Sequence, residues 1–440
     1  MKREEAIVGA LLVLFACRAV LASAIVPPWQ GPDEPVHFVL AQLLSQSDGN
    51  LPGARTILER QVLQSMGKHH WWEPYGGRTP DPLPESFELA TRRLGVGVYS
   101  QPLYYGLGAA LLRIAPSRDV EGAYWRLRLL SIALCATTLA VGWSGTRLLF
   151  GPTVAVGSTA IAALHPQFVL TAISVNSDAL VILLGTLMWW LVACVVSRRR
   201  TAMSFLLILA ASAATLLTKR SAVAVAATAA VLAAASLATA GMRHATVRTI
   251  ASTAIVVMIG AAILAIGWTT FEGLPTQLGS FWRDGLLVRR APAEMTLSQV
   301  LTYGRISTDY AWLIGGWLRF PAPEPWLWIT RTLTVMGFAG AVVLLLTKQV
   351  PRSPLAIAWL FVIVQAGTVI AWGFLTLSSP QGRYLFPVIA PATALLWLGL
   401  TRLTPARFQR YAPAGVVSVL AILDVTGFTT VLIPAYLPWG

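Results

Sequence analysis

Long apolar runs, separated by short polar connectors, dominate the chain. A helix needs roughly 20 apolar residues to cross the hydrocarbon core of a bilayer, and each run comes close to that length. The runs lie at residues 6–26, 127–149, 153–173, 177–196, 202–218, 221–240, 249–269, 326–347, 355–376, 384–402 and 413–434. They predict an all-α, polytopic membrane helical bundle of about 11 transmembrane helices, with residues 1–440 forming a single integral membrane domain.

Composition agrees with a chain whose solvent is largely lipid. Hydrophobic residues make up 56% of it and charged residues only 12%, whereas soluble domains carry about 25% charged residues. The net charge of +14 comes from Arg and Lys in the connectors, not from a basic stripe interleaved with aromatic residues, so no nucleic-acid partner is expected. Cys17, Cys135 and Cys194 fall inside apolar runs without disulfide or metal-ligand spacing.

The basic connectors also predict the topology. If the short run at 103–115 is interfacial or re-entrant, most of them fall on the side of Lys2 and Arg3. Cytoplasmic loops are enriched in Lys and Arg, so we expect a multi-pass protein of the cytoplasmic (inner or plasma) membrane with a cytoplasmic N-terminus and an external C-terminus. The first run carries Arg18 and lacks a small-residue cleavage site, so we interpret it as a retained anchor with Arg18 facing protein.

This topology places two long segments outside, at 27–126 and 270–325, together with a turn at 378–383. The first external loop, 27–126, alternates apolar and polar residues between Pro and Gly breaks. That pattern is typical of short amphipathic helices that lie on a membrane surface, and it predicts a lid of interfacial helices packed on the bundle.

An acidic pair, Asp33 and Glu34, follows the first run directly, between Pro32 and Pro35 and close to His37. Two adjacent carboxylates beside a medium of low dielectric cost free energy to hold, so packing does not explain them. One of them can act as a general base toward a hydroxyl, and the other can bind a divalent cation or polarise the first. In the alternative interpretation Asp33 is the N-cap of a helix and Glu34 lies in its first turn.

Two further polar elements are candidates for the same site. Gln101 and Tyr104 end the first external loop, where a tyrosine can also be a simple interfacial belt residue. Asn176 and Asp178 lie in a polar patch between two runs, on the external side in this topology. A lone Asp at that position can cap the next helix, but a second external acidic site favours a functional role for Asp178.

Two basic clusters break the positive-inside pattern. Lys219 and Arg220 lie between two runs, and Arg383 lies between Gln381 and Tyr384 in the turn before another run. Such violations are most simply offset by an anion, and a phosphate at the outer leaflet suits both a Lys point charge and the planar fork of Arg. In the alternative interpretation these side chains anchor lipid headgroups or snorkel.

Several of these elements together resemble a known superfamily. Acidic residues after the first span, the Gln101–Tyr105 element, an Asp that opens a later span, and Lys219 between spans resemble the GT-C superfamily of membrane glycosyltransferases. More closely, Pro32–Phe38, Ser174–Leu180 and Gln381–Pro387 resemble a bacterial membrane family catalogued as domain of unknown function 2142. The chain departs from this pattern at Gln101, where many relatives carry His.

The resemblance implies a GT-C-like bundle and an inverting glycosyltransferase. The enzyme would move a sugar from a polyprenyl-phosphate donor to a cell-envelope glycan, lipid or protein acceptor at the outer face of the cytoplasmic membrane. It implies that Asp33 is the base or a metal ligand, that Asp178 is the second acidic residue, and that Lys219 meets the lipid phosphate. Asp33 and Asp178 are therefore candidate ligands for a divalent cation, Mg or Mn.

The predicted catalytic residues are thus Asp33, Glu34 and Asp178. The predicted substrate-binding residues are His37, Gln101, Tyr104, Asn176, Lys219, Arg220, Gln381, Arg383 and Tyr384. A second hypothesis is a transporter or flippase of a lipid-linked or anionic solute, which charges midway through spans would favour; only Arg18 and Asp424 clearly qualify. A non-catalytic scaffold is a third reading if the acidic pair is only a helix cap.

Overall fold

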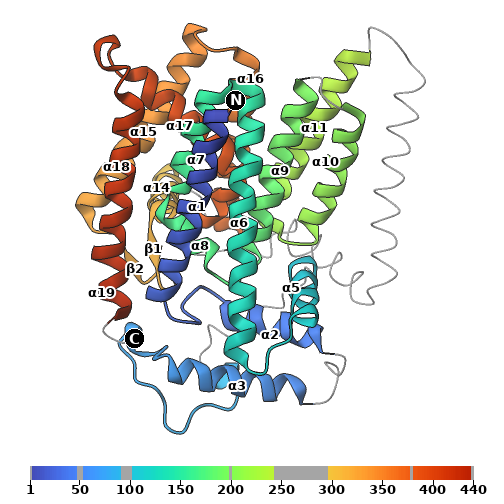
Figure 1. The fold of residues 1–440 in the computed structure, drawn as a ribbon, viewed down its shortest axis with the longest axis vertical. Coiled ribbons are helices and arrows are strands. Elements are labelled where there is room, and N and C mark those ends of the chain that lie inside the picture. Colours follow the sequence, from blue (N-terminus) through green and yellow to red (C-terminus); the bar gives the residue numbers. More distant parts are fainter. Residues whose placement is uncertain are drawn as a thin grey trace.

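A computed structural model describes residues 2–46, 53–90, 102–197, 201–241, 296–376 and 380–437. Gln101, the predicted span at 249–269 and the first part of the 270–325 loop lie outside these ranges. The described residues form a bundle of long helices whose axes run between two ends of the molecule (Figure 1). The N-terminus lies at one end, and the chain reaches residue 437 at the other.

Seven helical stretches of the described ranges are long and apolar enough to cross a membrane. They are Arg3–Ile25 in α1 (Lys2–Ile25), α6 (Val120–Phe150), α9 (Asp178–Val196), α15 (Glu324–Thr347), Arg352–Ala371 in α16 (Arg352–Thr376), Gly382–Arg402 across η3 (Gly382–Val388) and α17 (Ile389–Leu403), and Ala412–Tyr436 across α18 (Ala412–Gly427), η5 (Phe428–Leu432) and α19 (Ile433–Tyr436). Helices suit this environment because every backbone group is bonded within its own segment. The chain is therefore an all-α polytopic membrane bundle.

The expected count of 11 stays a prediction. The run at 153–173 is broken into α7 (Pro152–Ala163) and α8 (Pro166–Ala172), which are bent by 67° and form an eighth span only if taken together. The runs at 202–218 and 221–240 form the shorter apolar helices α10 (Thr201–Leu216) and α11 (Val223–Gly241), with η2 (Arg220–Ala222) between them.

The break between α7 and α8 is held by a buried arginine. Pro166 cannot continue a helix that needs its N–H, so the carbonyls at the end of α7 lack helical partners. Arg18, on α1, donates to the Ala163 and Leu164 carbonyl oxygens and also pairs with Asp424 on α18. Arg18 therefore faces protein, as expected, and the two mid-span charges that would favour transport neutralise each other.

Short helices gather at the end of the bundle where the described chain finishes (Figure 1). They are α2 (Glu34–Ser45), α3 (Ala54–Lys68), η1 (Glu73–Tyr75), α4 (Phe87–Ala90) and α5 (Leu103–Ile114). α5 packs on α2; at 1.5 Å per residue a helix of 12 residues is only about 18 Å long, too short to span the bilayer. This arrangement agrees with the interfacial or re-entrant interpretation of 103–115.

The described part of the predicted 270–325 loop is ordered into a helix and a hairpin. α14 (Leu297–Trp312) begins with a capping box between Thr296 and Gln299. It leads into β1 (Ile314–Gly315), which pairs antiparallel with β2 (Phe320–Pro321), so that Ile314 lies opposite Pro321. Residues 314–318, in β1 and the turn that follows it, line the site described below.

Candidate active site

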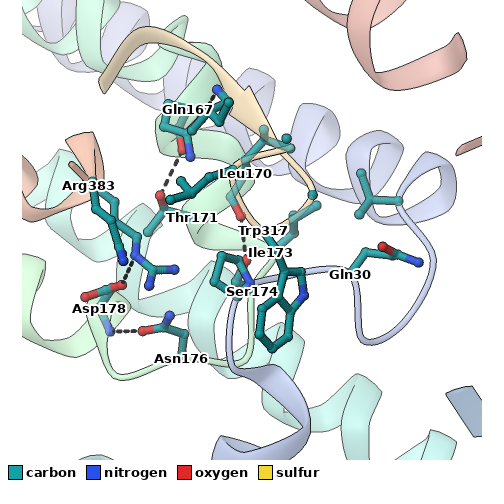
Figure 2. A pocket seen from close by; sticks show the side chains of 18 of the residues that line it. Gln30, Gln167, Leu170, Thr171, Ile173, Ser174, Asn176, Asp178, Trp317 and Arg383 are labelled. Atoms are coloured by element: carbon teal, nitrogen blue, oxygen red, sulfur yellow. Dashed lines mark hydrogen bonds and ion pairs between the residues drawn. The ribbon is translucent and has the colours of Figure 1, made fainter. Parts of the chain in front are cut away.

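A cleft lies among the ends of α6, α8 and α9, the loop after α1, the β1–β2 hairpin and η3. Figure 2 shows Arg383, Asp178 and Asn176 at one side of it and Trp317 and Gln30 toward the other. The residues that line it are Val26, Gln30, Gly31, Pro32, Arg128, Gln167, Leu170, Thr171, Ile173, Ser174, Asn176, Asp178, Ile314, Gly315, Gly316, Trp317, Leu318, Gln381, Gly382, Arg383 and Tyr436. Segments far apart in the sequence thus contribute to one cavity.

Two carboxylates and two cations form an ion cluster, and two of its members, Asp178 and Arg383, line one end of this cleft. One oxygen of Asp178 pairs with the Lys219 ammonium, and the other lies 3.1 Å from Arg383 Nε. Arg383 Nη2 in turn lies 3.7 Å from Asp33 Oδ2. These four residues come from four of the segments that the sequence singled out, and their formal charges balance. We call them the ion cluster below.

The ion cluster is held by local backbone structure. Asp178 is the first residue of α9, and its N–H donates to Asn176 Oδ1 at 2.6 Å, which fixes the turn before the helix. The side chain of Asp178 is only 2% exposed, so it is buried and needs both cations to satisfy it. Asn176 therefore fixes the backbone that positions the buried carboxylate of Asp178.

Gln365, a residue that the sequence analysis missed, joins the two segments that carry the cations. Its side chain is fully buried on α16, and Nε2 donates to the Ser221 carbonyl at 2.9 Å and to the Tyr384 carbonyl at 2.6 Å. Ser221 lies two residues after Lys219, and Tyr384 follows Arg383 directly. A lone Gln in an apolar run gives a weak signal, and only its two partners reveal its position.

Close packing fixes Arg383 as well. A Cβ on Gly382 would collide with the backbone of Ala311 on α14, so only glycine lets η3 approach that helix. Tyr384 lies beside both cations, with its ring centroid 4.9 Å from Lys219 Nζ and 5.6 Å from Arg383 Cζ. Gln381, also predicted, lines the cleft, and its Oε1 has no hydrogen-bond partner within the described ranges.

Asp33 differs from Asp178 in both exposure and backbone conformation. Its side chain is 32% exposed, and its backbone lies in the left-handed region at φ 64°. It occupies the N-cap position of α2, but its side chain makes no capping hydrogen bond, so the cap interpretation does not account for its carboxylate. Burial raises the pKa of Asp33 above its usual value against the opposing effect of Arg383 and Lys219. A carboxylate with a raised pKa is a stronger base than an ordinary Asp.

Glu34, the neighbour of Asp33, has a different environment. Its carboxylate is fully buried and accepts hydrogen bonds from the Gly31 N–H at 2.7 Å, the Val175 N–H at 2.8 Å and the Tyr124 hydroxyl at 2.9 Å. A Cβ on Gly31 would lie 2.7 Å from this carboxylate. Glu34 thus ties the loop after α1 to the loop before α9, and this geometry favours an anchoring role over the predicted catalytic one.

His37 and Tyr104 lie near each other, with ring centroids 6.5 Å apart, but neither of them lines the cleft. His37 Nδ1 shares a hydrogen bond of 2.8 Å with the Tyr105 hydroxyl, and the Tyr104 hydroxyl lies 3.3 Å from Ser131 Oγ. Burial, helped by the nearby Lys219, lowers the pKa of His37 to about 3. His37 is therefore neutral at physiological pH and does not add a cation to the site. Gln101 lies outside the described residues, and so does the side chain of Arg220.

The donor set does not fit a divalent cation in this arrangement. Both oxygens of Asp178 face cations, and Asp33 faces Arg383. Over the described ranges, no group of three or more His, Cys, Asp or Glu residues is arranged to hold a metal ion. Hard cations need several oxygen ligands, and the carboxylates of the ion cluster already have partners.

Comparison with known proteins supports a transferase. A protein-family model described as "Dolichyl-phosphate-mannose-protein mannosyltransferase" matches residues 119–268, about a third of the chain. This match supports the resemblance to the GT-C superfamily and glycosyltransferase activity in general. No curated protein matches the chain.

Among solved structures, the apo oligosaccharyltransferase of Archaeoglobus fulgidus is similar, with 12% identity and a TM-score of 0.45. That similarity covers 99% of this chain and 56% of the oligosaccharyltransferase chain. The chain thus spans little more than half of the length of that protein.

Proposed function

We propose that the chain is an inverting glycosyltransferase of the GT-C type. It would take a sugar from a polyprenyl-phosphate donor and pass it to a cell-envelope glycan, lipid or protein at the outer face of the cytoplasmic membrane. The observation that carries the proposal is the ion cluster: a partly exposed carboxylate and two cations meet through Asp178 and Arg383, which line a cleft beside helices of interfacial length.

In this proposal the cations receive the donor phosphate. Arg383 offers a planar fork and Lys219 a point charge, and both stabilise the negative charge that grows as the phosphate leaves. The 3.7 Å contact between Arg383 and Asp33 is the weakest in the cluster. A phosphate that takes over this side of Arg383 would release the Asp33 carboxylate, while Asp178 keeps both cations in position.

Asp33 is the proposed general base. The acceptor hydroxyl oxygen attacks the anomeric carbon, the bond from that carbon to the phosphate oxygen breaks, and the hydroxyl proton moves to the Asp33 carboxylate. The sugar is transferred with inversion, and polyprenyl phosphate leaves as the anion. A phosphate leaving group needs charge stabilisation more than protonation, so this scheme needs no acid on the departing side.

A direct assay tests the proposal. The purified full-length protein, reconstituted in vesicles, is incubated with a panel of radiolabelled polyprenyl-phosphate hexoses and an envelope extract as acceptor source. We expect release of polyprenyl phosphate and label in the acceptor fraction for at least one sugar. Movement of intact lipid-linked sugar across the vesicle membrane, without cleavage, would support the transporter hypothesis instead.

A further inference from the structure

The cleft has a second end, away from the ion cluster, that the proposed function does not use. Gln30 and Trp317 line it, one from the loop after α1 and the other from the turn of the β1–β2 hairpin (Figure 2). Gln30 is only 1% exposed. Its Nε2 and the Nε1 of Trp317 are both buried and have no hydrogen-bond partner among the residues that the structure describes.

Buried donors without partners are rare, because each loses its bonds to water and gains nothing in return. The carboxamide of Gln30 is already fixed at its other end, where Oε1 accepts from the Tyr75 hydroxyl at 2.7 Å. Because Oε1 is fixed by Tyr75, Nε2 of the same carboxamide can donate to a ligand in the cleft. The unpartnered donors of Gln30 and Trp317 therefore favour a ligand that carries hydrogen-bond acceptors, such as hydroxyl oxygens.

The hairpin presents Trp317 in a strained conformation. Gly316, Trp317 and Leu318 all have positive φ, at 48°, 50° and 66°. Non-glycine residues in this region cost free energy and persist only where their surroundings hold them. Trp71, from the segment after α3, packs edge-on against the Trp317 ring with centroids 5.9 Å apart and an interplanar angle of 84°. The indole thus has an aromatic partner in the protein, while the side chain also borders the cavity.

We propose that this end of the cleft is a subsite for a pyranose ring, with Trp317 as its stacking surface and Gln30 as a hydrogen-bond donor to a ring hydroxyl. This inference rests on the proposed function, since the subsite lies in the same cleft as the ion cluster. An aromatic ring with a polar N–H matches a sugar, which has an apolar C–H face and a rim of hydroxyls. The ring comes from the donor or from a glycan acceptor.

The test compares ligands with and without sugar, bound to the purified full-length protein. Affinity is measured for polyprenyl phosphate and for polyprenyl phosphates carrying gluco-, galacto- and manno-hexoses. We expect the sugar to tighten binding by about tenfold for at least one hexose, the gain expected from one stacking or hydrogen-bonding contact. Trp317→Ala and Gln30→Leu should remove this gain but leave the affinity for bare polyprenyl phosphate unchanged.

Matched variants separate recognition from folding. Trp317→Phe keeps a ring and should retain most of the gain, while Trp328→Ala, at a tryptophan that is 62% exposed on α15, should retain all of it. Deoxyhexoses that lack one hydroxyl should lose the part that depends on Gln30, because a polar site rejects a ligand that leaves it unpaired. If Trp317→Ala and Gln30→Leu keep the full gain, the subsite does not hold the donor ring.

A third arm distinguishes the two sources of the ring and separates this inference from the proposed function. With the protein labelled with 5-fluorotryptophan, the Trp317 resonance, assigned from Trp317→Phe, is followed during titration with polyprenyl-phosphate hexoses and with methyl glycosides. A shift with the lipid-linked sugars identifies the donor ring, and a shift only with methyl glycosides identifies an acceptor ring. If neither class of ligand shifts the Trp317 resonance, the subsite is overturned, even if polyprenyl phosphate binds. If polyprenyl phosphate fails to bind but a methyl glycoside still shifts the resonance, only the proposed donor is overturned.

Discussion

Arg383 Nε lies 3.1 Å from Asp178 Oδ2, although more than 200 positions separate the two residues in the chain. The Lys219 ammonium pairs with the other oxygen of the same carboxylate. One buried acid thus holds two cations that the positive-inside pattern leaves unexplained. The acidic and basic residues that stood out separately in the sequence therefore belong to a single charged site.

Removing the acid should destabilise the fold. Asp178→Asn leaves Arg383 without its main counter-charge in a buried position, and breaking a buried pair in this way costs about 3–5 kcal/mol. We expect a clear fall in the thermal unfolding temperature of the detergent-solubilised protein. Adding Lys219→Met to Asp178→Asn removes one uncompensated charge and should recover part of the loss. An Asp178→Asn variant as stable as the wild type would mean that this pair does not hold the site together.

Glu34→Gln should lower stability more than Asp33→Asn. In Glu34→Gln an amide N–H would face the Gly31 N–H, so one buried donor loses its acceptor, at a cost of about 1–3 kcal/mol. Activity should fall in proportion to the folded fraction, measured by size-exclusion chromatography. A fully folded and inactive Glu34→Gln would instead support the catalytic role that the sequence suggested.

The raised pKa of Asp33 makes its contribution to stability depend on pH in a defined direction. An acid whose pKa is raised in the folded state binds its proton more tightly there than in the unfolded chain. Its contribution is therefore fully present below the ordinary value of 3.8 and is lost as pH rises through the folded pKa. At neutral pH, Asp33→Asn should be at least as stable as the wild type, because Asn avoids this burial cost and tolerates the left-handed backbone. A large loss of stability at pH 7 would contradict this assignment.

Gln365→Leu should weaken binding of the lipid-linked sugar donor, although Gln365 does not contact the substrate in the proposed scheme. The change removes the side-chain N–H group shared by the Ser221 and Tyr384 carbonyls, so the segments that carry Lys219 and Arg383 lose one of the contacts that link them. We expect KM for the lipid donor to rise about tenfold, the effect of roughly 1.4 kcal/mol, with a smaller change in kcat. Thr368→Val is the matched control on the same helix, because the Thr368 hydroxyl donates to the Val364 carbonyl within that helix. Equal effects of both variants would indicate a general disturbance of α16.

The sequence predicted the charged residues of the ion cluster better than the residues that hold them in place. Asp33, Asp178, Lys219 and Arg383 stand out in a sequence because a charge at the edge of an apolar run has few structural explanations. Glu34 stands out equally, yet its carboxylate is buried among three donors, while the side chain of Asp33 is 32% exposed. The left-handed backbone at Asp33 points the two adjacent carboxylates in different directions. Composition and residue spacing do not predict such a direction.

The remaining parts could not be found from the sequence for a related reason. Gln365, Gln30 and Trp317 are ordinary residues of an apolar run, a proline-rich turn and a loop. Their roles depend on partners far away in the chain, namely Ser221 and Tyr75 for the two glutamines and Trp71 for the tryptophan. Similarly, the long helices follow from hydropathy alone, but the 67° break between α7 and α8 depends on Arg18 from another helix as well as on the local Pro166.

The most direct test of the central claim is sugar transfer by Asp33→Asn. The variant and the wild type are compared at equal folded concentration, with polyprenyl phosphate release from a labelled polyprenyl-phosphate hexose as the readout. Loss of a general base should lower kcat by about 100-fold to 10,000-fold, while the affinity for polyprenyl phosphate stays the same or increases because Arg383 is relieved of a competing carboxylate. Transfer at the wild-type rate by a folded Asp33→Asn variant would contradict the assignment of Asp33 as the base.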